Sequence, residues 1–195
     1  MSRPVQYELN DVLDRAMGAF WQLGYAACSM QILVDATGLS RQSIYNIFGD
    51  KDGLFREVIR HYRTLIEEQC SVLLAQEADL NSLRTFVLNA LKSQRRYGSG
   101  ACLIVVTAFS PQARNEKIKP ALDEGARHVQ HALEAVLARA QSHGELPAHL
   151  SLRAAATQLY AVMNGLSALQ QTGTSQDQIE ATLDMTIATL KQVDG

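Results

Sequence analysis

The sequence predicts an all-α protein in two parts: an N-terminal three-helix domain that contains a helix-turn-helix, and a larger C-terminal helical domain. Only four prolines occur in the 195 residues, and no long stretch alternates apolar and polar side chains with the period of a strand. Apolar side chains instead recur every three or four residues, which is the period of an amphipathic helix. We place the first domain at residues 1–52 and the second at residues 53–195.

Serine, aspartate and glycine mark the ends of the first four helices. Gly24 and Gly38 stand where the first and second helices are expected to stop, because glycine readily adopts the left-handed conformation found beyond a helix C-terminus. Ser29, Ser40 and Asp50 are suited to cap the second, third and fourth helices. The fourth helix has no breaker until about position 75. The first helix is expected to bury a stripe made of Val12, Leu13, Ala16, Met17 and Phe20.

Further helices are expected along the rest of the chain, separated by short stretches of turn-forming residues such as YGSG and HGELP. Pro120 falls in the first turn of one of them, where a missing N–H costs little. We place these helices at residues 79–96, 100–109, 116–142, 151–170 and 176–192.

Composition narrows the class of protein. Hydrophobic residues make up 47% of the chain and charged residues 19%, as in globular proteins. The longest strongly apolar run, residues 101–109, is far shorter than the roughly 20 residues that a membrane-spanning helix needs. The N-terminal residues lack the apolar segment of a signal peptide. We therefore expect a cytoplasmic protein that does not contact a membrane.

Signatures of enzymes, metal sites and cofactor sites are missing from the sequence. It contains no G-x-S-x-G, no G-x-x-x-x-G-K-[ST] and no H-E-x-x-H motif, so we expect it not to be an enzyme. Its three cysteines are widely spaced and form no C-x-x-C pair. His128 and His131 could bind a metal together with Glu124, but no fourth ligand is evident and a solvated histidine pair is the favoured interpretation. We expect no cofactor and no metal.

The segment GLSRQSIYNIFGDKDGLF, residues 38–55, predicts a helix-turn-helix. Its second helix, residues 40–47, is too short to be stable alone and must be held by its neighbours. We expect Ile44, together with Ile47 or Phe48, to face inward.

The outward side chains of this helix suit the edges of base pairs. Arginine pairs with guanine, glutamine and asparagine pair with adenine, and hydroxyl groups accept either role. Residues 40–63 also carry a net charge of +2 on a chain whose total is −2, which is compatible with nucleic-acid binding. An ordinary polar face on a surface helix is the alternative interpretation. The outward set is Arg41, Gln42, Ser43 and Asn46.

Residues 13–55 resemble the DNA-binding domain of TetR-family transcriptional regulators. The shared pattern includes A-x-x-x-F-x-x-x-G-Y from Ala16 to Tyr25 and S-M-Q-x-L from Ser29 onward. Its most specific part is G-L-S-x-x-x-I-Y-x-x-F-x-x-K-x-x-L, from Gly38 to Leu54. The resemblance implies a protein that binds double-stranded operator DNA through its helix-turn-helix.

The resemblance also implies roles for individual residues. The helix at residues 40–47 would enter the major groove, Tyr45 would pack on the DNA backbone, and Lys51 would meet a phosphate at the start of the next helix. Arg3, in the N-terminal arm, would add a contact to phosphate or the minor groove. The DNA-binding residues expected on this basis are Arg3, Ser29, Gln31, Ser40, Arg41, Gln42, Ser43, Tyr45, Asn46 and Lys51.

Three positions depart from the family pattern or from helix propensity. Ile47 stands where many relatives carry histidine or tyrosine, so a phosphate contact is expected to be missing there. Cys28 replaces a frequent threonine and its hydroxyl. Gly53 lies in the first turn of the fourth helix, where glycine costs up to about 1 kcal/mol against alanine.

The second domain is expected to bind a small-molecule effector and to form a homodimer. By resemblance, a mainly apolar pocket lies among its helices, although a plain core role is the alternative for each candidate. Apolar stripes on the last two helices would form a four-helix bundle with those of a partner. The candidate pocket residues are Phe86, Tyr97, Cys102, Val106, Phe109 and His128. The candidate interface residues are Leu152, Leu159, Met163, Leu166, Ile179, Leu183, Ile187 and Leu190.

The favoured function is that of a ligand-responsive DNA-binding regulator, a repressor that a small-molecule effector of unknown identity releases from a near-palindromic operator. One alternative makes Cys102 a sensor of electrophiles or oxidants, although its apolar neighbours argue against a reactive thiol. Alternatives from other classes are an enzyme on a helical scaffold and a helical interaction protein that does not bind DNA.

Overall fold

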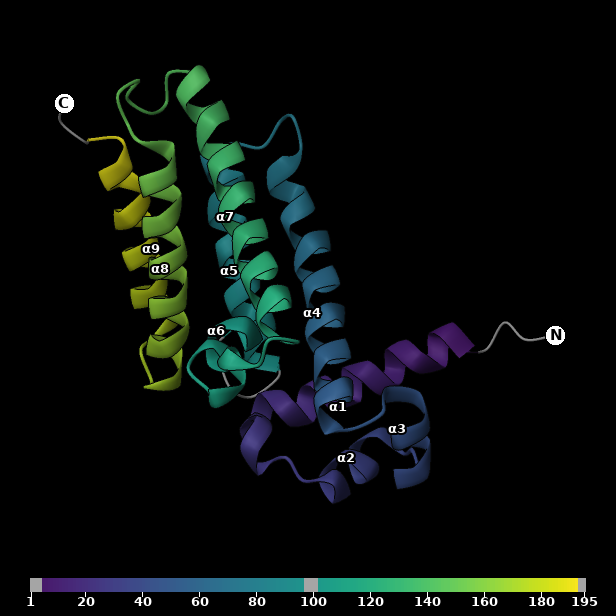
Figure 1. The fold of residues 1–195 in the computed structure, drawn as a ribbon. Helices are drawn as coiled ribbons and strands as arrows, with labels where there is room; N and C mark the ends of the chain where they lie inside the picture. Colours follow the sequence, from purple (N-terminus) through teal and green to yellow (C-terminus); the bar gives the residue numbers. More distant parts are fainter. Residues whose placement is uncertain (1–4, 97–101, 193–195) are drawn as a thin grey trace. The chain divides into compact units, whose positions relative to one another are not determined.

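The computed structural model describes residues 5–96 and 102–192. Every regular element in these residues is a helix, which confirms the predicted all-α class (Figure 1). The helices form two compact units: unit 1 contains Met1–Leu65 and Leu103–Gly125, and unit 2 contains Ile66–Cys102 and Ala126–Gly195. The predicted domain boundary after residue 52 stays a prediction. No described helix combines the length and hydropathy needed to cross a lipid bilayer.

Unit 1 is built around its first helix, α1, against which both α2 and α6 pack, while α3 packs against α2 (Figure 1). The first part of α4 and the start of α7 complete the unit, together with the short 3-10 helix η1. The bounds are α1 (Val5–Ala27), α2 (Met30–Thr37), α3 (Arg41–Phe48), α4 (Lys51–Leu74), α6 (Leu103–Ala108), η1 (Pro111–Arg114) and α7 (Lys119–Ser142).

Aromatic side chains join α1 to α4 inside unit 1. The ring centroids of Phe20 and Phe55 lie 4.8 Å apart, those of Tyr25 and Phe55 lie 5.0 Å apart, and those of Trp21 and Tyr62 lie 4.9 Å apart. All three pairs meet edge to face, a favourable arrangement for rings with a negative face and a positive edge. The helix that follows α3 in the chain is therefore fixed to α1.

The predicted helix ends are confirmed by their geometry. The side chains of Ser29, Ser40 and Asp50 each accept a hydrogen bond from the backbone N–H three residues later, at 3.2, 3.0 and 2.6 Å. Gly38 has the left-handed conformation expected beyond α2, with φ of 74°. Gly24 also has φ of 74° and interrupts the helical conformation shortly before the end of α1.

Gly53 has a steric role that helix propensity does not predict. A Cβ atom built on Gly53 would lie 1.9 Å from the carbonyl oxygen of Phe48 and 3.0 Å from its carbonyl carbon. Real Cβ atoms do not approach backbone this closely, so a side chain cannot be added without moving the end of α3. Helix propensity alone predicts that glycine is unfavourable at position 53. The structure shows that glycine is needed there, because the end of α3 lies too close to the start of α4 for a side chain.

Unit 2 contains the last part of α4, most of α7, and the helices α5, α8 and α9. Each of these three helices packs against the other two. The side chain of Ser175 accepts a hydrogen bond from the N–H of Gln178, and the two residues form a capping box at the start of α9. The bounds of the three helices are α5 (Leu80–Arg96), α8 (Leu152–Gln171) and α9 (Gln176–Leu190).

Arg84 links α5 to α9 at the surface of unit 2. Its guanidinium donates to Asp184 at 2.5 Å and to Glu180 at 2.9 Å. The hydrogen bond from Arg84 holds the pKa of the Asp184 carboxyl below its ordinary value. These exposed pairs add orientation more than stability, because water screens them.

Helix boundaries differ from the sequence prediction between α5 and α7. The helix expected at 100–109 is Leu103–Ala108 among the described residues, and the 3-10 helix at Pro111–Arg114 was not predicted. The helix expected from position 116 begins at Lys119, because the side chain of Asn115 accepts from the N–H of Lys117 at 2.9 Å and holds a turn there. Pro120 lies in the first turn, as predicted.

Candidate nucleic-acid interface and ligand sites

One side of α3 anchors the helix and the opposite side is open to solvent. Ile44 is fully buried and Phe48 is half-buried, and these two side chains define the inner side. At 3.6 residues per turn, Gln42 and Asn46 lie on the opposite side, and both are exposed. The amide of Gln42 donates from Nε2 to Oδ1 of Asn46 at 3.0 Å, so the two side chains are held together.

Two side chains lie on each flank of this outer face. Arg41 and Tyr45 are exposed on one flank, and Tyr45 is 43% exposed. The half-buried Ser43 and the exposed Ile47 lie on the other flank, and Ile47 is 54% exposed. The sequence predicted that either Ile47 or Phe48 faces inward together with Ile44. The structure shows that Phe48 does so, because it follows Ile44 by about one full turn of the helix.

The serine hydroxyls of the helix-turn-helix already serve as caps. The Oγ of Ser40 accepts from the N–H of Ser43, and the two hydroxyls lie 2.8 Å apart. The Oγ of Ser29 caps α2, and Gln31 donates to Asp35 at 2.9 Å. These side chains are exposed or half-buried, and their roles as DNA contacts stay predictions.

Lys51 is directed toward α1. Its Nζ donates to the carbonyl oxygen of Tyr25 at 2.6 Å and lies 4.1 Å from the centre of the Tyr25 ring. The phenol of Tyr25 in turn donates a short hydrogen bond to Asp52. The pKa of Tyr25 is raised well above its ordinary value, mainly by burial and secondly by this hydrogen bond. An ammonium has three donors, so Lys51 keeps the capacity for a phosphate contact. Arg3 lies outside the described residues.

Family models identify the chain. The model described as "Bacterial regulatory proteins, tetR family" matches residues 12–58, which include the whole helix-turn-helix. The model described as "Tetracyclin repressor-like, C-terminal domain" matches residues 79–186, more than half of the chain. The chain belongs to the TetR family. This TetR-family protein is a DNA-binding transcriptional regulator, and the family match confirms the expectation that it is not an enzyme.

Similar proteins agree with the family match over nearly the full length. The HTH-type transcriptional repressor ComR of Escherichia coli (strain K12) is 27% identical over 182 residues, which are 91% of this chain and 86% of that protein. A TetR-family regulator from Agrobacterium tumefaciens has the same fold, with a TM-score of 0.84 at 20% identity over 95% of this chain and 98% of that chain. A cysteine mutant of the TetR-family regulator CifR, complexed with 26-base-pair operator DNA, has a TM-score of 0.75 at 26% identity over 97% and 100% of the two chains.

The candidate pocket residues of the TetR-family regulator do not gather at one described cavity. Phe86 lines a cavity, Cys102 is buried, and Val106 is half-buried. His128 is half-buried, and its Nε2 is buried without a hydrogen-bond partner among the described residues. Phe109 is 90% exposed, so in this chain it does not line an enclosed pocket. Tyr97 lies outside the described residues.

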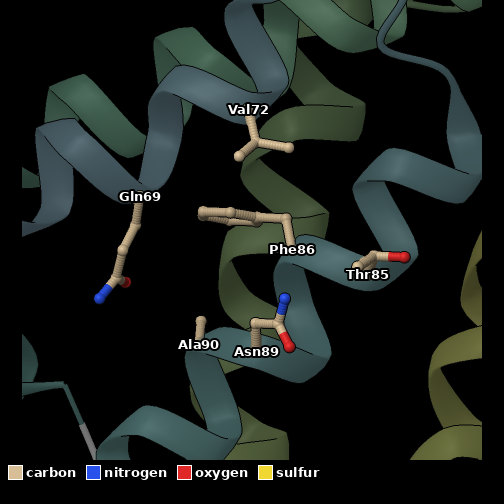
Figure 2. A pocket seen from close by; sticks show the side chains of 6 residues that line it. All are labelled: Gln69, Val72, Thr85, Phe86, Asn89 and Ala90. Atoms are coloured by element: carbon tan, nitrogen blue, oxygen red, sulfur yellow. The ribbon is translucent and has the colours of Figure 1, made fainter.

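The cavity at Phe86 lies between α4 and α5 in unit 2 and has a volume of about 200 Å³. Figure 2 shows the ring of Phe86 projecting from α5 toward the part of α4 that carries Gln69 and Val72. The remaining lining residues are Thr85, Asn89 and Ala90, and most of the surface that the cavity exposes is apolar. The cavity is below the 300–1,000 Å³ typical of drug-sized ligands, which limits it to a small molecule or part of one.

Thiol chemistry is unfavourable at the three cysteines. Cys28, Cys70 and Cys102 are buried, and none lies in a disulfide. Burial raises the pKa of the Cys28 thiol and raises that of Cys70 to about 12, so both stay protonated at neutral pH. Burial, with a further contribution from neighbouring Cys102, raises the pKa of Tyr160 to about 12. Within the described residues, no three metal-ligating side chains lie close enough to hold an ion.

The residues predicted for the subunit interface lie inside unit 2. Leu152 is half-buried, and the other seven of the eight are buried by their own chain. A side chain already covered by its own protomer has little surface left for a partner, and the interface role of these residues stays a prediction. The outward face of α8 carries small side chains instead, namely Ala154, Thr157, Ala161, Gly165 and Ala168. The sequence pattern could have shown this face, because the same helical period places it opposite the stripe.

Proposed function

We propose that this TetR-family protein is a ligand-responsive repressor that acts in the cytoplasm as a two-fold homodimer on a near-palindromic operator. The observation that carries the proposal is the outer face of α3, where Gln42 and Asn46 are exposed and aligned opposite the buried anchor. The names of two relatives support it, since ComR is a transcriptional repressor and CifR is complexed with operator DNA.

We further propose that Gln42 and Asn46 read one adenine as a pair. Their mutual hydrogen bond leaves the Oε1 of Gln42 as an acceptor and the Nδ2 of Asn46 as a donor. The major-groove edge of adenine presents N6–H₂, which donates, and N7, which accepts. Guanine presents two acceptors there, so the pair favours an A·T base pair in each half-site.

A mobility-shift titration on the promoter DNA beside the gene tests the reading face. Gln42→Ala is expected to weaken operator binding by about 5- to 150-fold, the worth of one good base contact, and to relax the preference at one base pair. Arg41→Ala is expected to lower both affinity and specificity. Lys92→Ala, at an exposed cation of α5, is the matched control and should bind as the native chain does. Absence of any sequence preference at moderate salt, with both α3 variants unaffected, contradicts the proposal.

We place the subunit interface on the outward faces of α8 and α9. The small side chains along α8 allow the close approach of a second helix, and α9 adds Met185, which is 67% exposed. Paired with the same faces of a partner, these helices would form a four-helix bundle. A two-fold dimer presents two copies of α3 to half-sites one DNA turn, or a multiple of it, apart.

Ala161→Arg is expected to give a folded monomer, because the new side chain stands on the proposed interface but is exposed within one chain. The loss of the second half-site should weaken operator binding by about 100-fold or more. Sedimentation velocity and a mobility shift measure the two effects. Ala138→Arg, at an exposed alanine of α7, is the matched control. A dimer that survives Ala161→Arg excludes this interface.

For the effector we propose a small molecule that binds in unit 2 and favours a conformation that mismatches the operator. The cavity at Phe86 is the described candidate, and its mainly apolar lining, with the amides of Gln69 and Asn89 beside it, suits a ligand with an apolar body and one or two hydrogen-bonding groups. The test is to titrate an identified effector into the native protein and into the variant Phe86→Trp, whose larger side chain fills part of the cavity. The variant should bind the effector more weakly, and an equal affinity of the two proteins excludes this site.

A further inference from the structure

Unit 1 contains a second, larger cleft whose lining is rich in arginine. The cleft has a volume of about 540 Å³ and lies between the first part of α4 and residues 116–124, which lead into α7 and form its first turns. It is more than twice as large as the cavity at Phe86 and falls in the range of small-molecule sites. Its charged lining residues are Arg56, Arg60, Arg63, Lys117, Glu116 and Glu124.

The three arginines follow one another along one side of α4. Arg56 and Arg60 are four residues apart and Arg60 and Arg63 are three apart, so neighbouring like charges share a helix face. Such spacing is unfavourable by itself and raises the positive potential inside the cleft.

Carboxylates offset only part of this charge. Glu57 serves two arginines at once, with Arg60 at 2.7 Å and Arg56 at 3.6 Å. Glu124 forms an ion pair with Arg63. Four cationic and two anionic groups line the cleft, and with Glu57 beside it the local balance is one positive charge.

We propose that this cleft binds a small multivalent anion through carboxylate or phosphate groups. Guanidinium groups present planar, paired donors that match both kinds of oxyanion, and Lys117 adds a compact charge from the opposite wall. Pro120 and Ala121 provide apolar surface for the carbon frame of an organic anion. The site is distinct from the outer face of α3 and from the cavity at Phe86, and its existence does not depend on the function proposed above.

The two walls of the cleft are separated by more than fifty residues of sequence but belong to the same compact unit. An anion held by both walls ties α4, the helix that directly follows α3, to the start of α7 and the residues just before it. Binding to the folded chain alone stabilises it by mass action, so the anion should raise the unfolding temperature.

The test uses the full-length protein without DNA. Sodium citrate and sodium phosphate are titrated by calorimetry and in thermal unfolding, against sodium chloride at equal ionic strength. We expect citrate to raise the unfolding temperature more than chloride does, and the double variant Arg60→Gln/Lys117→Gln to bind citrate at least tenfold more weakly. Arg153→Gln, at an exposed arginine outside the cleft, should bind as the native chain does. Equal effects of all three salts, or unchanged citrate binding by the double variant, overturn the proposal.

A second measurement separates a free anion from DNA phosphate as the source of the oxyanion. Operator affinity of the double variant is measured as a function of chloride concentration, in buffer without multivalent anions. Unchanged affinity and an unchanged salt slope support a site for a free anion. A salt slope reduced by about one or two units shows that the cleft contacts the DNA backbone instead, and overturns the assignment.

Discussion

Replacing Ile44 with alanine is expected to lower the free energy of unfolding by about 2–5 kcal/mol and to weaken operator binding severely. Ile44 is fully buried, so the substitution removes apolar contacts and leaves a cavity beneath α3. The helix has only eight residues and cannot persist without its anchor. Urea denaturation followed by circular dichroism measures the first effect, and a mobility shift measures the second.

Ile47 provides a control of the same residue type in the same helix. It is 54% exposed, so Ile47→Ala should change the free energy of unfolding by no more than about 0.5 kcal/mol. A similar loss of stability from both substitutions would show that α3 is not seated by Ile44, and the orientation of its outer face would have to be revised.

Gly53→Ala is expected to destabilise the protein by about 1–3 kcal/mol, against the gain of up to about 1 kcal/mol that helix propensity predicts. The sign follows from the 1.9 Å distance between the added Cβ and the carbonyl oxygen of Phe48. Backbone cannot rotate away as a side chain can, so the end of α3 must shift. Operator affinity should fall with stability, because Phe48 closes the recognition helix.

Gly18 is the matched control for this substitution. It lies within α1 of the same unit, and nothing stands within 4 Å of a Cβ built on it. Gly18→Ala should therefore stabilise the chain by about 0.5–1 kcal/mol. The argument predicts that the denaturant midpoint of Gly53→Ala lies below that of the native protein and that the midpoint of Gly18→Ala lies above it. A gain in stability from both substitutions contradicts the argument.

Local signals predicted much of the fold. The caps at Ser29, Ser40 and Asp50 and the stop at Gly38 depend on side-chain and backbone chemistry that acts within a few residues. The spacing of residues from Gly38 onward predicted the helix-turn-helix in the same way, and the resemblance of this motif to TetR-family regulators predicted the family that the match confirms.

What the sequence could not predict depends on contacts between segments. Whether Ile47 or Phe48 faces inward is decided by the neighbours of α3, and the need for glycine at position 53 is decided by the carbonyl of Phe48. The stripe on α8 looked available for a partner, although α5 and α9 of the same chain cover it. The arginines of α4 became a candidate site only when residues 116–124, at the start of α7, were placed opposite them.

The discontinuity of unit 1 has a consequence for synthesis on the ribosome. Residues Leu103–Gly125 belong to this unit, and α6 within them packs against α1. The N-terminal part of the chain therefore emerges before the segment that completes its compact unit. At about 5–20 residues per second, the interval between residue 65 and residue 125 lasts on the order of several seconds. During that interval α1 lacks the packing that α6 provides in the finished structure, and the chain is more than half made when the last segment of unit 1 is added.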